Sequence, residues 1–149
     1  MPPIALIVAA HGNLAPALLE SAAMIAGTIE KAAAITFAPS EGPDDLLAKY
    51  EEAVNQLGET DVLFLVDLFG GSPYNAAARF VAPRGSADIL TGVNLPILIE
   101  VLARRQRSGV TLTKLVKAGQ LAGQASVRVF SESYTPTTTT TSSEEGDEL

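Results

Sequence analysis

Residues 4–13 read IALIVAAHGN, an uninterrupted apolar run that ends at a histidine and a glycine. A run this short, rich in branched side chains and followed by turn-forming residues, predicts a strand buried on both faces over residues 4–10. Asn13 can cap a helix, apolar residues then recur at helical spacing, and Gly27 can end that helix. The N-terminal stretch therefore predicts a strand–helix unit.

The same alternation of strand and helix continues outward from this unit. Further strands are predicted at residues 33–38, 62–68, 87–90 and 127–130. Further helices are predicted at residues 43–57, 73–81, 96–106 and 113–124, with Ser72 as the N-cap of the second of them and Thr111 as that of the last. Strands that alternate with helices favour an α/β fold, with an open, mostly parallel central sheet and helices on both faces.

Length and composition favour one globular domain, which we place at residues 1–131. The chain has 149 residues, of which 47% are hydrophobic and 18% are charged. Residues 132–149 contain a threonine run and acidic residues, so we predict a disordered tail or linker there. Five of the 17 acidic residues and none of the 10 basic ones lie in this tail, which therefore carries most of the net charge of −7.

Several classes of function are disfavoured by what the sequence lacks. The chain has no cysteine and one histidine, which excludes a disulfide framework, a thiolate metal site and a histidine-rich metal centre. We expect no metal and no cofactor. No basic stripe with interleaved aromatic residues points to nucleic acid, and the cluster Arg104, Arg105 and Arg107 is interpreted as a solvated helix end. Without a long apolar run or a basic leader, the expected location is the cytoplasm.

Ligands of open parallel sheets bind outside the carboxyl ends of the strands, which here selects the loops at residues 11–13, 67–73 and 91–96. His11 lies in the first loop and Asp67 begins the second. A carboxylate beside one ring nitrogen fixes the tautomer and leaves the other nitrogen free as a nucleophile. Gly71 and Ser72 lie in the Gly-Gly-Ser-Pro turn before a helix, where free N–H groups and the helix dipole favour an anion.

Together these groups predict phosphoryl transfer through a phosphohistidine. A histidine phosphatase is disfavoured because there is no second histidine and because Ala10, not an arginine, precedes His11. Metal-dependent hydrolysis is disfavoured because the sequence offers too few ligands. A nucleophile without an evident general acid favours a carrier that receives a phosphoryl group and passes it on.

Three motifs follow one another along the chain: IVAAHG at residues 7–12, VDLFGGSPYNAA at residues 66–77 and TGVNLP at residues 91–96. In this order they resemble the IIA domain of the mannose family of the bacterial sugar phosphotransferase system. The resemblance covers roughly residues 4–130. It implies that His11 is phosphorylated by phospho-HPr and passes the phosphoryl group to a IIB domain or subunit. It also implies that Asp67 holds the other ring nitrogen and that Ser72 and the Gly71 region contact the phosphoryl group.

The resemblance further implies a homodimer that exchanges its C-terminal strand, which would be residues 127–130. Contact with the membrane would be indirect, through IIC and IID subunits. The linker-like tail favours a fusion to IIB beyond residue 149 over a separate IIB chain. Two alternatives remain open: the phosphocarrier subunit of a phosphoenolpyruvate-dependent dihydroxyacetone kinase, and a regulatory IIA-like domain of a transcriptional activator.

Overall fold

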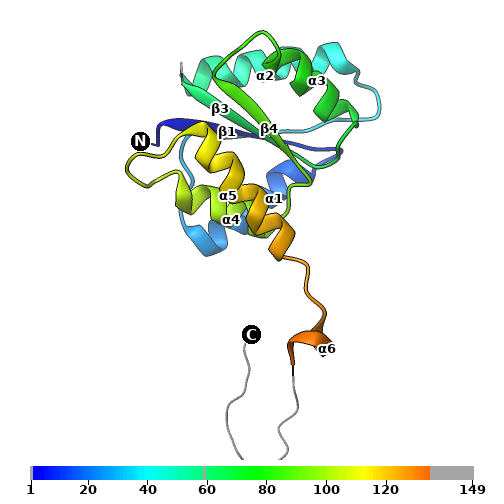
Figure 1. Ribbon diagram of the computed structural model, residues 1–149. Coiled ribbons are helices and arrows are strands. Elements are labelled where there is room, and N and C mark those ends of the chain that lie inside the picture. The colour runs from blue at the N-terminus through cyan, green and yellow to red at the C-terminus, as the bar shows by residue number, and fades with distance from the viewer. Residues whose placement is uncertain (1, 59, 135–149) are drawn as a thin grey trace, which may run out of the picture.

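The computed structural model describes residues 2–58 and 60–134, and it confirms an α/β fold with an open parallel sheet between two layers of helices (Figure 1). The strands are β1 (Ile4–Ala9), β2 (Ala32–Ile35), β3 (Asp61–Val66) and β4 (Ala87–Thr91). The helices are α1 (Leu14–Ala26), α2 (Pro43–Leu57), α3 (Ser72–Val81), α4 (Leu95–Arg104), α5 (Leu112–Ala125) and α6 (Phe130–Ser133). The sheet order is β2-β1-β3-β4, and every pair is parallel.

The two central strands, β1 and β3, are apolar on both faces because helices cover both sides of the sheet. In Figure 1, α2 and α3 lie on one face, and α1, α4 and α5 lie on the other. Ala5, Ile7 and Ala9 of β1 point into the core under α2 and α3, whereas Leu6 and Val8 point to the opposite core. Because side chains along a strand point alternately to the two faces of the sheet, β1 contributes side chains to both cores.

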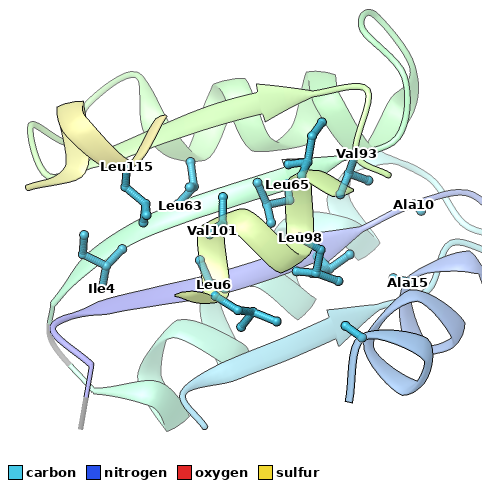
Figure 2. Packing of buried hydrophobic residues seen from close by; sticks show 14 residues of the cluster. Ile4, Leu6, Ala10, Ala15, Leu63, Leu65, Val93, Leu98, Val101 and Leu115 are labelled. Carbon is cyan, nitrogen blue, oxygen red and sulfur yellow. The ribbon is translucent and has the colours of Figure 1, made fainter. Parts of the chain in front are cut away.

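The core on the side of α1, α4 and α5 is a layer of aliphatic side chains (Figure 2). Leu6 and Leu65 of the central strands lie opposite Leu98 and Val101 of α4, and all four side chains are fully buried. Helix α5 packs closely against the sheet here, since Gly119 has no Cβ atom. A Cβ atom at this position would lie 2.7 Å from Leu90 Cδ2. The glycine therefore sets how near α5 approaches β4 and α4.

The predicted strand at residues 127–130 is not formed within this chain. Residues 127–129 have no regular structure, Phe130 begins the short helix α6, and this segment leads away from the body in Figure 1. A strand needs a neighbour for its backbone groups, and the segment has none among the described residues. Glu132 and Ser133, at the start of the predicted tail, belong to α6, and residues 135–149 lie outside the described residues.

The interpretation of the arginine cluster as a solvated helix end is wrong for Arg105, whose side chain is only 1% exposed. Its guanidinium donates to the carbonyl oxygens of Ile4 at 2.8 Å and Lys31 at 3.0 Å, and also to that of Glu30. Burial lowers the pKa of Arg105 to about 10, with Glu30 opposing that shift, so the group stays charged at neutral pH. Arg105 thereby ties the end of α4 to the starts of β1 and β2.

Replacing Arg105 with methionine should lower the free energy of unfolding by about 3 kcal/mol, because one buried and two partly buried carbonyl groups lose a charged donor. Urea denaturation followed by circular dichroism measures this change. Arg107→Met is the matched control, since Arg107 is exposed and its replacement should cost less than about 0.5 kcal/mol. Equal stability of the two variants would show that the Arg105 clamp does not support the fold.

Candidate functional site

His11 and Asp67 meet at the carboxyl edge of the two central strands. The parallel register pairs Ala9 with Val66, so the residues that follow β1 and β3 leave the sheet side by side. Asp67 Oδ2 lies 2.8 Å from His11 Nδ1 and also accepts a hydrogen bond of 3.0 Å from the backbone N–H of His11. The structure therefore brings together the two residues that the sequence selected from separate loops.

This pairing determines how the imidazole is presented. An ionised carboxylate can only accept hydrogen bonds, so Nδ1 must carry the ring proton that points at Asp67. The lone pair of the neutral ring then lies on Nε2. The His11 side chain is 47% exposed and that of Asp67 is 15% exposed, so the nucleophile is accessible while the carboxylate that orients it is largely covered.

The backbone around His11 is held against the end of β2. Gly12 adopts a positive φ of 58° and forms an isolated antiparallel bridge with Phe37, with N–O distances of 2.8 and 3.3 Å. The Phe37 ring contacts the imidazole edge-on, with centroids 5.8 Å apart and an interplanar angle of 84°. The turn that only glycine adopts easily thus places an aromatic ring against His11.

Gly71 brings the start of α3 against the free side of the imidazole. A Cβ atom at Gly71 would lie 2.9 Å from His11 Cε1 and 3.5 Å from Nε2. Nε2 therefore lies beside the N-terminus of α3, where the first N–H groups lack helical partners and the helix dipole favours an anion. The arrangement can accept a negatively charged group on Nε2.

Ser72 does not act as the predicted helix cap. It is the first residue of α3, Gly71 occupies the N-cap position, and no side chain caps this helix. The Ser72 hydroxyl makes no hydrogen bond to the described residues, so it is available at the helix start beside Gly71. Asn13 occupies the N-cap of α1 without a capping bond, whereas Thr111 caps α5 as predicted by accepting from the N–H of Lys114.

Tyr50 supports the start of α3, a role that the sequence analysis did not predict. Its hydroxyl donates to the Pro73 carbonyl at 2.9 Å, and its ring packs edge-on against Phe64 and Phe80. Burial, and secondarily the charge of Asp67, raises the pKa of Tyr50, so the hydroxyl keeps its proton. A buried tyrosine needs a polar partner, but only the tertiary structure shows that the partner is α3.

The remaining groups near the site have structural roles. Asn75 Nδ2 donates to the Gly70 carbonyl at 3.1 Å and so closes the turn before α3. The third predicted loop is attached to β3 by a bond of 3.0 Å from the Val93 N–H to the Val66 carbonyl, but it gives no hydrogen bond to His11 or Asp67. Arg79 Nη1 lies 3.5 Å from Asp44 Oδ1, so this arginine pairs with Asp44 and not with Asp67.

The described residues contain neither a close group of three metal-ligating side chains nor a helix that could span a membrane. Across residues 2–58 and 60–134, no three His, Cys, Asp or Glu side chains are grouped closely enough to bind a metal ion. Within the same ranges no helix has both the length and the apolar character needed to cross a bilayer.

Comparison with known proteins gives relatives over nearly the whole chain. The family model described as "PTS system fructose IIA component" matches residues 5–118. The chain is 41% identical over 147 residues to the fructose-specific EIIA component of Bacillus subtilis strain 168, covering 98% of this chain and 99% of that protein. It is 42% identical over 103 residues to the mannose-specific EIIAB component of Escherichia coli K12, covering 68% of this chain and 32% of that protein.

Solved structures similar to this chain belong to the same kind of protein as the sequence relatives. The EIIA component from Streptococcus agalactiae superposes with a TM-score of 0.80 at 27% identity, covering 87% of this chain and 98% of that chain. The mannose/sorbose-specific IIA subunit from Enterococcus faecalis also has a TM-score of 0.80, at 28% identity, covering 93% of this chain and all of that one. The chain therefore belongs to the mannose-type IIA family of the sugar phosphotransferase system.

Proposed function

We propose that this chain is a phosphoryl carrier that accepts phosphate from phospho-HPr on His11 and passes it to a IIB domain or subunit during coupled sugar uptake and phosphorylation. The single observation that carries the proposal is the 2.8 Å contact between His11 Nδ1 and Asp67 Oδ2, which leaves Nε2 as the exposed nucleophile. Membership of the family makes the chain a component of the phosphotransferase system, and the geometry around His11 supports the step that we propose for it.

In this step the Nε2 lone pair attacks the phosphorus atom, the Nε2–P bond forms, and the bond from phosphorus to HPr breaks. The ring becomes positively charged, and Asp67 stabilises that charge through the proton that remains on Nδ1. The phosphoryl oxygens would face the start of α3, where Gly71 allows close approach and the N–H groups and the Ser72 hydroxyl can donate. Transfer to IIB repeats the displacement with Nε2 as the leaving group.

We also infer a homodimer in which residues 127–130 join the sheet of the partner subunit. The sheet order leaves one edge of β4 without a neighbouring strand among the described residues. Val127, Val129 and Phe130 are 84%, 51% and 75% exposed, which is unfavourable for three large apolar side chains in a single copy. Adding such a segment to an open strand edge gives its backbone groups hydrogen-bond partners and buries its apolar side chains.

The cellular setting follows from the same proposal. A carrier that works between HPr and IIB operates in the cytoplasm and meets the membrane only through IIC and IID subunits. We retain the division into a domain at residues 1–131 and a tail or linker at residues 132–149 as a prediction.

His11→Ala should abolish phosphorylation by phosphoenolpyruvate, enzyme I and HPr, because the chain has no other imidazole. Acid-labile phosphate on the protein is the measurement, and circular dichroism shows that the variant is folded. Acid-labile phosphate retained at the wild-type level would rule out His11 as the acceptor.

Asp67→Ala should leave the fold intact and slow single-turnover phosphorylation by about 100-fold, because the ring loses both its fixed tautomer and its counter-charge. Rapid-quench kinetics with phospho-HPr measure the rate, and ¹⁵N chemical shifts of the imidazole report the tautomer. Asp44→Ala is the matched control at an exposed carboxylate, and it should transfer at the wild-type rate. An unchanged rate in Asp67→Ala would contradict the orienting role.

Gly71→Ala should reduce the transfer rate at least about tenfold with little loss of stability, because the new methyl group would displace the imidazole from its position at the helix start. The same single-turnover assay measures this effect. Gly85→Ala provides the control, since a Cβ atom there meets nothing within 4 Å. Equal rates for the two variants would show that contact between Gly71 and the ring does not matter for transfer.

A further inference from the structure

The loop between β2 and α2 carries an aromatic side chain that lies against the imidazole. Phe37 follows β2 closely, and its ring is edge-on to that of His11 with 5.8 Å between the ring centroids. Its backbone pairs with Gly12 through hydrogen bonds of 2.8 and 3.3 Å. The Phe37 side chain is half-buried and also packs against the core under α2 and α3. The position of this loop therefore sets one wall of the imidazole site.

Glu41 closes the loop on itself. Its Oε1 accepts a hydrogen bond of 2.8 Å from the Ala38 N–H, and the Glu41 N–H donates to the Ala38 carbonyl at 3.0 Å. Hydrogen bonds from Lys49 and from the Ala38 N–H hold the pKa of Glu41 below its usual value, so this carboxylate is ionised at neutral pH. A fixed negative charge therefore lies in the same loop as Phe37.

Lys49 of α2 attaches this loop to the body of the protein. Its ammonium group lies 2.8 Å from Glu41 Oε2 and 3.0 Å from Glu41 Oε1, and it also donates to the Thr36 carbonyl at 2.8 Å. The Lys49 and Glu41 side chains are only 32% and 23% exposed, so salt screens this pair less than a fully exposed one. One cation thus holds the loop on both sides of Phe37.

Helix α2 is a firm support for this contact. Tyr50, the residue that follows Lys49, is fully buried. Its ring packs edge-on against Phe64 and Phe80 of the core, and the buried face of α2 continues one turn before and after it. A cation fixed to such a helix can restrain a loop, whereas an ion pair between two mobile surface segments contributes little.

We propose that Lys49 is a positioning residue for His11, which acts by fixing the loop at residues 36–41 and so holding Phe37 against the imidazole. Asp67 fixes the ring at Nδ1, but a single hydrogen bond leaves the ring free to tilt. The Phe37 contact removes part of that freedom and keeps Nε2 aimed at the incoming phosphorus atom. The kinetic consequence rests on the proposed function, whereas the placement of the ring does not.

Lys49→Met and Glu41→Gln break the ion pair in two independent ways. Each should slow single-turnover phosphorylation at saturating phospho-HPr by about fivefold, because a displaced ring meets the phosphorus atom in a less favourable orientation. The phospho-HPr concentration that gives half the maximal rate should stay unchanged, since only a docking defect would raise it. Glu51→Gln is the matched control: it removes the carboxylate that α2 offers to Arg84, and it should transfer at the wild-type rate.

The single histidine of the chain provides a second measurement that does not depend on phosphoryl transfer. Its ring C–H signals are unique in a ¹H–¹³C spectrum, and the nearby Phe37 ring shifts them. Phe37→Leu gives the position of these signals without the aromatic ring. At the high-pH limit, where the imidazole is neutral in every variant, Lys49→Met and Glu41→Gln should move the signals roughly half of the way to that position. Glu51→Gln should leave them in place.

A double-mutant cycle shows whether Lys49 acts through Phe37. Phe37→Leu alone should also slow transfer about fivefold. Adding Lys49→Met should slow it less than about twofold further, because the two changes remove the same restraint. Full additivity of the two effects would contradict the proposal. Wild-type histidine signals in Lys49→Met would contradict it too, as would displaced signals with an unchanged rate.

Failure of this proposal can be told apart from failure of the proposed function. Circular dichroism first establishes that each variant is folded. A wild-type chain that accepts no phosphate from phospho-HPr would overturn the proposed function. The histidine signals then decide the placement by themselves: displaced signals in Lys49→Met support the positioning role, and unmoved signals overturn it.

Discussion

The parallel pairing of β1 with β3 is the constraint on which the rest of this structure depends. Its register sets Ala9 beside Val66, so the chain segments that follow them deliver His11 and Asp67 to one edge. The same two strands form the centre of both cores, with alternate side chains packed under opposite helix layers. A slip of one residue would reverse those layers and separate the imidazole from its carboxylate.

The imidazole is held from three directions by elements that are far apart in the chain. Asp67 binds Nδ1, Phe37 packs edge-on against the ring, and Gly71 lies against Cε1 and Nε2. Tyr50 in turn fixes the first turn of α3 through the Pro73 carbonyl. Asp67 Oδ1 is buried without a hydrogen-bond partner among the described residues, an arrangement that costs stability.

Sequence periodicity predicted most of the fold because helices and buried strands repeat apolar residues at different spacings. It placed α2 at Pro43–Leu57 and ended α1 at Gly27, in agreement with the structure. It predicted a strand at residues 127–130, which finds no strand partner among the described residues of this one chain. It misjudged Arg105, since a basic residue at a helix end is usually solvated and nothing local reveals three distant carbonyl acceptors.

The sequence by itself determined the alternation of elements, the single imidazole and the loops that could carry chemistry, because these depend on residue type and local spacing. Only the tertiary structure decided that Asp67 faces Nδ1, that Gly71 lies against the ring, and that Tyr50 supports α3. It also decided that four basic side chains, Arg104, Arg107, Lys114 and Lys117, line one groove between α4 and α5. These contacts join residues remote in sequence, and their geometry is set by strand register and helix packing, which local patterns do not encode.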